Sequence, residues 1–531
     1  TKARVCLTGY PLQNNLVEYW TMVNFCSPKF LGELADFRNS YVNPIGNGLY
    51  LDSSPTDKRT STLRMKALQS LLESIVDRRD MNVLHSQLPR KAEYVIACPL
   101  TPAQMRLYSA YLAHVVGIGP DSEDSSIVQA ASGQNLLVHC SVLSSICNHP
   151  AICHSVVTSN TGTSTAAAKR AQAEISPISI DEGAGLDQLE DLAQELGSGG
   201  GSSNPGGRNI DWCKDIFASY SEPDQNLRLP SHCLKVVLML DIIRLSIAQG
   251  ERVLVFTRSI PTLDYLQQAV EASGILATSG SSLRIDGSTN IAYRQDLIDS
   301  FNAPDSPHYL FFISSGTGSI GVNLIAASRV IIFDVGWNPL YDEQAIARAY
   351  RYGQRRRVYV YRLITAGTWE DNMFSNNMFK VAMTRRVVDR QSTGRRITRD
   401  DMRRYFQHPS LNPPTISTDD VAHLAQEYHD DSVFTTLLAD HASSLTKVTP
   451  QATLVAEEEE HLLEGDSEII KSMVIAELQR FGRIPVASTP QVNASNTSGV
   501  SAMATTNLAA SAAFNSSRPQ MLRPPLPQLP Q

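Results

Sequence analysis

Between residues 230 and 375, short apolar segments alternate with helical patterns, and this alternation constrains the fold more than any other feature. Leu234, Leu238 and Leu245 have the spacing of one helix face. The apolar segments of strand length are residues 253–256, 283–285, 310–313, 330–333 and 358–363. Continuous apolar strands separated by helices predict a parallel sheet with helices on both faces. Because ligands of such sheets bind at the carboxyl ends of the strands, we expect functional residues there.

The first 155 residues carry further elements. Residues 5–7 predict a short core strand that runs into a turn, and residues 16–23 have helical spacing. Residues 94–98 predict a strand, and Thr101 followed by Pro102 predicts the start of a helix.

Two segments have a composition typical of disorder. Residues 156–209 are rich in Ser, Thr, Gly, Ala and acidic residues, and cannot bury enough apolar surface to offset their ordering entropy. Residues 451–531 are first acidic and then rich in Ser, Thr, Ala and Asn. They end in a proline run, which is either a plain polyproline tail or a ligand for an SH3 or WW domain.

Residues 344–354 predict a short helix that carries two arginines. Arg348 and Arg351 are three residues apart and would share one face, with Gln344 one turn earlier. Gly353 is suited to the left-handed conformation that ends a helix. Two fixed guanidinium groups suit phosphoryl transfer, whose negative charge must be neutralised in the transition state.

The charge distribution also favours contact with phosphate. The 531 residues carry a formal net charge of −7. From Arg348 to Arg404 there are 15 Lys and Arg against 5 Asp and Glu, a local balance of +10 that leaves −17 for the rest. A basic region on an acidic chain is typical of a phosphate-contacting surface.

The cysteines and the hydropathy indicate the compartment. The eight cysteines are scattered and form no CxxC pair, which favours a reduced intracellular location. No apolar run approaches membrane-spanning length and no signal peptide is recognisable, so we expect no membrane partner.

A series of ordered motifs runs through residues 1–155 and 210–405. The motifs are Thr8-Gly-Tyr-Pro-Leu-Gln-Asn-Asn15, Leu88-Pro-Arg-Lys91, Ile146-Cys-Asn-His-Pro150, residues 253–257, Asp286-Gly-Ser-Thr289 with Arg294, residues 314–324 with Gly318, Gly321 and Asn323, Asp334 with Trp337-Asn-Pro339, and the arginine helix. Together they resemble the Swi/Snf family of ATP-dependent DNA translocases, chromatin remodellers with two RecA-like lobes. Asn43-Pro-Ile-Gly-Asn-Gly48, Asp211-Trp212 and Arg386-Val-Val-Asp389 are similar to the ATRX-like members within the wider Rad-type group.

The resemblance implies roles for individual residues. Arg348 and Arg351 would be arginine fingers of the second lobe, acting on ATP and Mg²⁺ held mainly by the first lobe. Gln344, Gly318 and Gly321 would lie at the ATP. The DNA contacts would come from Thr257, Ser288, Arg294, Ser314, Ser315, Asn323 and Trp337. Motif III, with Thr8, Gly9, Gln13 and Asn14, would couple the two activities. Trp337 has a second interpretation as a packing residue after a core strand.

The sequence departs from the family in three places. Tyr10 replaces the usual Thr of motif III, and Gly316 and Thr317 interrupt motif V. There is also no Gly-x-x-x-x-Gly-Lys-Thr/Ser loop and no Asp-Glu-x-His box. Since the chain starts at Thr1, close to motif III, we expect a fragment that lacks the phosphate-binding half of the first lobe and is inactive alone.

The predicted fold class is α/β, the C-terminal part of a tandem RecA-like helicase core, with a parallel sheet flanked by helices, helical insertions and disordered segments. We expect the remainder of the first lobe with a helical insertion at 1–95, a linking helical region at 96–155 and a disordered insertion at 156–209. The second lobe would follow at 210–380, a basic brace and C-terminal helices at 381–450, and a disordered tail at 451–531.

The predicted function is nuclear, ATP-dependent translocation on double-stranded DNA in chromatin, including DNA repair, with nucleosomes as partners and further proteins on the tail. Two alternatives stay open: a non-catalytic DNA-binding scaffold, and an RNA helicase of the same superfamily.

Some residues invite other interpretations. Cys147, His149, Cys153 and His154 do not have a usual zinc spacing, so we expect no metal site. Residues 355–357 suit either a localisation signal or a DNA-facing charge run. Asp286 suits a turn at a strand end better than a catalytic acid. Residues 385–404 would form a brace across both lobes or an exposed basic linker.

Overall fold

A computed structural model describes residues 3–12, 15–79, 87–116, 136–159, 211–219, 227–276, 282–315, 322–391, 394–395, 398, 408–410, 413–454, 465–481 and 483. Its centre is a sheet of seven strands in the order β3-β4-β2-β5-β6-β1-β7. The strands are β1 (Lys91–Cys98), β2 (Val253–Thr257), β3 (Ser282–Ile285), β4 (Leu310–Ser314), β5 (Arg329–Ile332), β6 (Val358–Thr365) and β7 (Lys447–Pro450). All neighbours pair in parallel except β1 and β7, which are antiparallel. The predicted α/β class with a mostly parallel, helix-flanked sheet is therefore confirmed.

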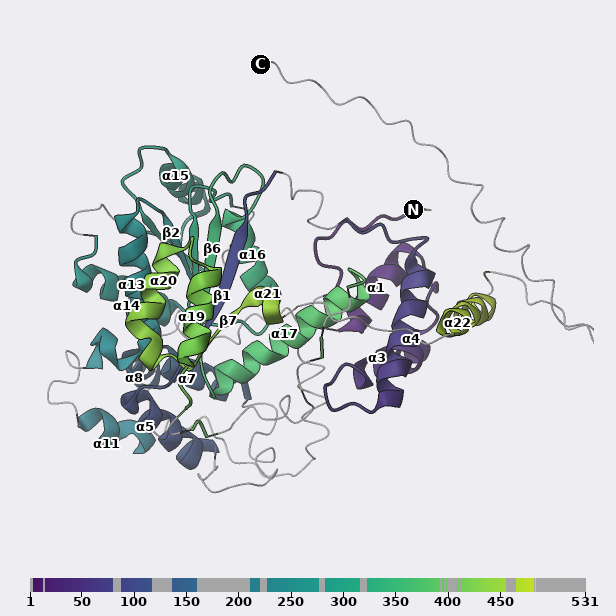
Figure 1. Cartoon of the computed structure of the whole chain (residues 1–531), viewed down its shortest axis with the longest axis horizontal. Helices are drawn as coiled ribbons and strands as arrows, with labels where there is room; N and C mark the ends of the chain where they lie inside the picture. The colour runs from purple at the N-terminus through teal and green to yellow at the C-terminus, as the bar shows by residue number, and fades with distance from the viewer. Residues whose placement is uncertain are drawn as a thin grey trace, which may run out of the picture. The chain divides into compact units, whose positions relative to one another are not determined.

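Helices cover both faces of the sheet because successive residues of each strand point to opposite sides. Val253 and Val255 of β2 face one cluster, while Leu254 and Phe256 face another. The first cluster includes α13 (Leu234–Ala248), α14 (Ile260–Ser273), α19 (Thr418–Glu427) and α20 (Ser432–His441). The second includes α15 (Ile291–Asn302) and α16 (Pro339–Ala349) (Figure 1).

A third cluster packs against β1 and the end of β6. Val95, Ala97 and Ile364 supply its sheet residues. Its helices are α5 (Pro102–Tyr111), α7 (Leu136–Asn148), α8 (Pro150–Ser159), α11 (Asp211–Ala218) and the start of α17 (Trp369–Val387). The predicted start of α5 is confirmed, since Thr101 and Gln104 form a reciprocal capping box.

The N-terminal helices form their own core together with the end of α17. They are α1 (Leu16–Cys26), α2 (Leu34–Phe37), α3 (Asn43–Asn47) and α4 (Pro55–Leu72). Met383 and Val387 of α17 pack among them. The Gln69 amide of α4 donates to the Arg386 carbonyl at 2.6 Å, which ties α4 directly to α17.

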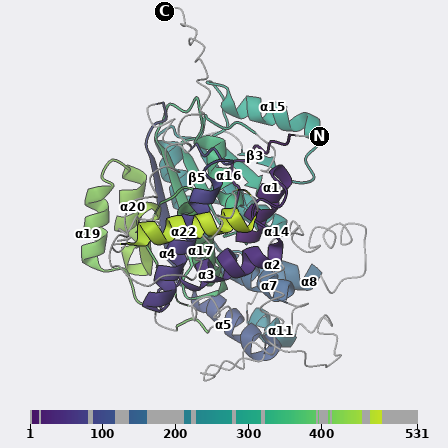
Figure 2. The same ribbon diagram turned by 90° about the vertical axis from the view of Figure 1, so that its right-hand side faces the viewer.

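The C-terminal part of the chain contacts both groups of elements. β7 and the short α21 (Gln451–Leu454) lie beside β1. α22 (Asp466–Arg480) lies against α4 (Figure 1 and Figure 2), where Arg59 and Asp466 form an ion pair at 2.7 Å. The prediction of a disordered tail is wrong for residues 451–454 and 466–480, because the apolar side of α22, with Val474 and Leu478, finds a core to pack on.

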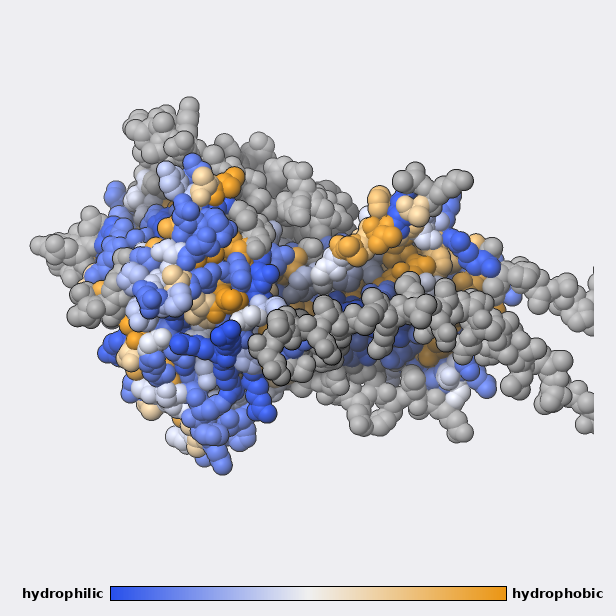
Figure 3. All heavy atoms as spheres, turned by 90° about the horizontal axis from the view of Figure 1, so that it is seen from above, coloured by the Kyte–Doolittle hydropathy of each residue, from blue (hydrophilic) through white to orange (hydrophobic). Residues whose placement is uncertain are grey.

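The structure corrects two other expectations near the N-terminus. Residues 5–7 form no strand, and Val5 and Leu7 are 81% and 95% exposed. Hydrophobic residues also reach the surface at several places on the face that Figure 3 shows. A strand needs a neighbour for its backbone hydrogen bonds, and no strand among the described residues pairs with this segment. The lobe boundary predicted at residue 95 falls inside β1, whose eight residues pair with β6. The insertion predicted from residue 156 begins within α8, and residues 160–210 lie outside the described residues.

No helix in the described part of the chain is long and apolar enough to span a membrane.

Candidate nucleotide and nucleic-acid site

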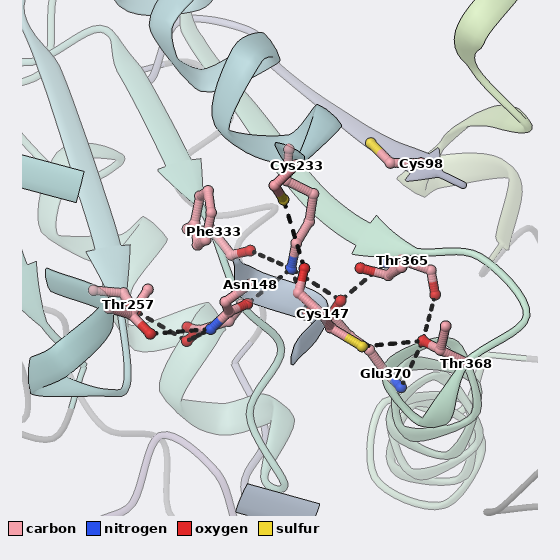
Figure 4. A network of polar contacts seen from close by, with 12 residues as sticks. Cys98, Cys147, Asn148, Cys233, Thr257, Phe333, Thr365, Thr368 and Glu370 are labelled. Carbon is pink, nitrogen blue, oxygen red and sulfur yellow. Dashed lines mark hydrogen bonds and ion pairs between the residues drawn. The ribbon is translucent and has the colours of Figure 1, made fainter. Parts of the chain in front are cut away.

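The carboxyl ends of the parallel strands meet at one edge of the sheet, as the sequence predicts. There a buried aspartate, Asp334, joins several segments, among them those of Thr257 and Asn148, which Figure 4 labels. One of its carboxylate oxygens accepts from the Thr257 hydroxyl at 2.9 Å and from the Asn148 amide at 3.1 Å. The other accepts from the backbone N–H of Arg258 at 2.9 Å. Burial raises the pKa of Asp334, while Lys235 acts against the rise.

A buried ion pair adjoins this aspartate. Lys235 of α13 lies 2.9 Å from both carboxylate oxygens of Glu370, in the first turn of α17, and the two side chains are 1% and 3% exposed. Lys235 also donates to Asn148 Oδ1 at 3.0 Å and to the Phe333 carbonyl at 3.2 Å. Glu370 accepts from the backbone N–H of Thr365 at 2.9 Å. Burial disfavours the charge of Lys235, but Glu370 together with Cys233 and Cys147 acts in the opposite direction, and the pKa of the lysine is raised.

The sequence analysis did not predict this network, apart from placing Asn148 and Asp334 in motifs. The signal was a lysine at the second position of α13, a mostly apolar helix whose other charged residues are Asp241 and Arg244. A charge at such a position is rarely buried unless it is paired. The network of Lys235 and Glu370 holds the strand ends, α13 and α17 together at the carboxyl edge of the sheet.

Thr257 consequently lies inside the protein. Its side chain is fully buried and bound to Asp334, so in this conformation its hydroxyl supports the edge instead of facing a phosphate. Ser315 is half-buried beside it, and the Ser315 N–H donates to the Thr257 carbonyl at 2.9 Å. Ser314 is 6% exposed at the end of β4. Asn323 is exposed, and its carbonyl accepts from the Asn302 amide at 2.7 Å.

The turn after β3 is closed by its own side chains. Asp286 accepts from the Ser288 N–H at 2.9 Å and from its hydroxyl at 2.6 Å, and pairs with Arg284 at 2.8 Å. Arg294 donates to the Thr289 carbonyl at 2.9 Å. Asp286 is therefore the turn residue that its setting favours, and the exposed Ser288 lies at the tip of the turn.

Trp337 follows β5 and packs against the cluster around α17. The Lys380 ammonium of α17 lies 5.1 Å from the Trp337 ring and donates to the Trp337 carbonyl at 3.1 Å. Burial lowers the pKa of Lys380 to about 8, with Glu18 acting against the fall. These contacts agree with the packing interpretation of Trp337.

The two arginines lie together at the end of α16. The predicted helix 344–354 is too long, because α16 ends at Ala349 and Tyr350 leaves helical geometry. Arg348 is in the last turn and Arg351 lies beyond it, where it donates to the Val322 carbonyl at 3.3 Å. Gly353 has a φ of +99° in the following turn, which is the left-handed region expected of it. Gln344 is half-buried earlier on α16.

The electrostatics of the pair favour an anion. Arg348 is half-buried, and burial, followed by the neighbouring Arg351, lowers its pKa. Among the described residues, no group accepts a hydrogen bond from the buried Arg348 Nε. Two adjacent positive charges with a spare donor are stabilised when an anion joins them.

The remaining predicted residues divide into two groups. Thr8 and Gly9 are exposed, and the Thr8 hydroxyl accepts from the Tyr10 N–H at 3.2 Å. Burial raises the pKa of Tyr10 to about 12, and Glu343 of α16 contributes to the rise. Gln13, Asn14, Gly318 and Gly321 lie outside the described residues.

The candidate zinc ligands make separate contacts. Cys147 lies 3.6 Å from the Thr368 hydroxyl, whereas His149 stacks on Tyr265 with a ring separation of 4.2 Å. Burial lowers the pKa of His149 to about 3. His154 meets Phe217 edge to face.

Comparisons with known proteins agree with these motifs. A model described as SNF2-related domain matches residues 1–152, and one described as helicase conserved C-terminal domain matches residues 234–353. Protein CHROMATIN REMODELING 20 of Arabidopsis thaliana is 33% identical over 461 residues, covering 84% of this chain and 30% of that protein. Helicase ARIP4 of Xenopus tropicalis is 35% identical over 419 residues, covering 73% and 29%. Transcriptional regulator ATRX of Homo sapiens is 32% identical over 474 residues, covering 76% and 19%.

The chain thus spans less than a third of the length of these curated relatives. Both matched domains occur in the expected order, and the matched segments contain motif III, the strand-end residues and the arginine pair. The chain belongs to the Swi/Snf family, with ATRX-like proteins among its relatives.

Proposed function

We propose that this chain supplies the second motor lobe of an ATP-dependent translocase that moves on double-stranded DNA in chromatin. The observation that carries the proposal is the arginine pair: Arg348 and Arg351 adjoin one another, and Arg348 keeps a buried donor without a described acceptor. A pair of this kind is suited to the charge that develops on a transferring phosphoryl group. Gln344, Gly318 and Gly321 would complete the nucleotide side.

ATP and Mg²⁺ would be held mainly by residues that this sequence lacks, since it contains neither a Gly-x-x-x-x-Gly-Lys-Thr/Ser loop nor an Asp-Glu-x-His box. The 531 residues alone would therefore be inactive as an ATPase. Within the longer protein, Mg²⁺ would neutralise phosphate charge, and Arg348 and Arg351 would contribute the charge from the second lobe. Thr8 and Gly9, with Gln13 and Asn14, would couple hydrolysis to movement.

DNA would bind along the carboxyl edge of the sheet. Ser288 at an exposed turn tip, Ser315 and Asn323 would meet backbone phosphates, and contacts of this kind position a duplex without reading its sequence. Arg294 and Ser314 would act from slightly deeper positions. Thr257 and Trp337 would support the edge, because one binds Asp334 and the other packs on α17.

The decisive experiment is Arg348→Ala in the full-length protein, with Arg79→Ala, at a side chain that is 77% exposed, as the matched control. We expect DNA-stimulated ATP hydrolysis to fall about 10³-fold or more, which is typical of arginine-finger loss. Double-stranded DNA affinity should change less than about threefold, because the arginines are proposed to act on ATP and not on DNA. Unchanged turnover in Arg348→Ala would refute the arginine-finger role.

The names of two relatives support a role in chromatin, since one is named a chromatin remodelling protein and the other a transcriptional regulator. A nuclear location with nucleosomes as the substrate is part of the proposal. DNA binding with a steep salt dependence but no response to nucleotide would instead favour a scaffold. A preference for single-stranded RNA over duplex DNA would favour an RNA helicase.

A further inference from the structure

A second buried charge cluster lies beside the arginine helix. At its centre is Arg362 of β6, which is 3% exposed. Its guanidinium pairs with Asp342 at 3.1 Å and with Glu343 at 2.9 Å, both in the first half of α16. It also pairs with Glu93 of β1 at 3.2 Å. One arginine thus joins β1, β6 and α16.

β1 reaches α16 at its other end as well. Lys91 forms an ion pair with Glu93, and its ammonium lies 5.3 Å from the ring of Tyr350, the residue that directly follows α16. The β1 charge cluster, defined as Lys91, Glu93, Asp342, Glu343 and Arg362, therefore contacts both ends of the helix. Arg348 lies between these two points of attachment, and Arg351 lies immediately beyond the second.

Stability alone does not explain such a cluster. Well-packed hydrophobic residues often stabilise a core as well as buried ion pairs do, because removing charges from water is costly. Ion pairs of arginine also fix an orientation, since a guanidinium donates its hydrogen bonds only in the plane of its fork. Arg362 can satisfy Asp342, Glu343 and Glu93 together only at one placement of α16 relative to β1.

The adjacent strand offers a natural comparison. Arg329 of β5 is 2% exposed and pairs with Glu251 and with Asp431, which precedes α20. It lies 4.0 Å from the Tyr359 ring. This network has the same chemistry and burial, but none of these partners belongs to α16. A variant in the Arg329 network therefore shows the effect of losing a buried ion pair alone, whereas a variant in the Arg362 network also loosens α16.

We propose that the β1 charge cluster positions α16, so that the strand entering the sheet from the N-terminal part sets the placement of Arg348 and Arg351. Lys91, Glu93 and Arg362 are positioning residues in this scheme. The functional part of the inference rests on the proposed arginine-finger role. The structural part, that Glu93 holds α16, stands without it.

The structural part is tested by amide hydrogen exchange in the full-length protein. Glu93→Gln removes one charge from the cluster, and Glu251→Gln makes the same change in the Arg329 network. We expect Glu93→Gln to speed exchange in α16 at least about tenfold, since the helix loses an attachment to the sheet. Glu251→Gln should leave α16 unchanged. Equal exchange of α16 in both variants would overturn the proposal, and Lys91→Met, at the cluster rim, is the second variant if Glu93→Gln does not fold.

The functional part is tested by DNA-stimulated ATP hydrolysis. We expect Glu93→Gln to lower kcat by about 10- to 100-fold, the range for a small misplacement of catalytic groups, with KM for ATP and DNA affinity unchanged. Glu251→Gln should retain kcat, and Glu93→Asp should restore part of it. Normal kcat with a loosened α16 would overturn the functional part. If Arg348→Ala is also fully active, the arginine-finger proposal has failed, and the exchange result alone decides whether Glu93 positions α16.

Discussion

The buried ion pair between Lys235 and Glu370 gives the sharpest test of how the carboxyl edge is held. Among the described residues, Lys235 is the cation paired with Glu370, at 2.9 Å, and Lys235→Met removes it. It also takes a donor from Asn148 Oδ1 and from the Phe333 carbonyl. Breaking a buried pair from one side costs about 3–5 kcal/mol, because the remaining charge stays buried without compensation.

The double variant Lys235→Met/Glu370→Leu should be less damaged than Lys235→Met. It removes both charges of the pair, and its remaining cost is the unpaired acceptors and the Thr365 N–H, worth about 1–3 kcal/mol. The double-mutant cycle should therefore give a coupling of about 2 kcal/mol or more. Arg79→Met is the control, since Arg79 and Asp77 are each 77% exposed and such pairs contribute about 0–1 kcal/mol.

Urea unfolding followed by tryptophan fluorescence provides the assay, because the buried Trp369 precedes Glu370 directly in the chain. The slope against urea should stay unchanged if only stability is affected. A loss below about 1 kcal/mol in Lys235→Met would refute the reasoning. The reasoning would also be refuted if the double variant lost as much unfolding free energy as the two single variants lose in sum.

Two further predictions concern packing and pH. Gly48→Ala should destabilise the N-terminal helices by about 1–3 kcal/mol, because an added Cβ would lie 2.3 Å from Ser61 Cβ. Gly46→Ala is the control and should be neutral or stabilising, because its added Cβ would meet nothing within 4 Å. Thermal unfolding of the two variants distinguishes these outcomes. Burial raises the pKa of Asp342 to about 7, with Arg362 and Arg258 opposing and Glu343 and Asp334 reinforcing the rise. The folded state therefore holds a proton that the unfolded chain releases near pH 4, so stability relative to Asp342→Asn should fall as pH rises from about 4 to 7. Urea unfolding midpoints are measured for the wild-type chain and for Asp342→Asn at pH 5 and at pH 8. From pH 5 to pH 8 the stability of Asp342→Asn should rise relative to that of the wild type. The same difference in midpoint at both pH values would contradict a raised pKa of Asp342.

Several elements follow from local pattern alone. The apolar runs that became β2, β4, β5 and β6 were recognisable because strands buried on both faces have few polar residues. Their carboxyl ends collect at one edge because parallel strands share a direction. The positive φ of Gly353 and the capping box at Thr101 were likewise local features of the sequence.

Other outcomes depended on contacts that no local pattern encodes. Asn148 meets Asp334 across 186 positions, and Lys235 meets Glu370 across 135. The inward role of Thr257 follows from its bond to Asp334, and the place of β1 in the sheet follows from its pairing with β6. A motif shows which residue types occur together along the chain, but not which strand ends they join in space.

Motif order and hydrophobic period therefore predicted the family, the α/β class and the residues of the arginine pair, since both are properties of short segments. The end of α16 at Ala349, the ion pairs of Arg362 with β1 and α16, and the packing of α22 on α4 followed from contacts between distant segments. The physical reason is that a helix end and a buried charge are stabilised by partners from distant segments. Those partners are set by the arrangement of the strands and helices, and the free energy of each contact exists only once that arrangement has formed.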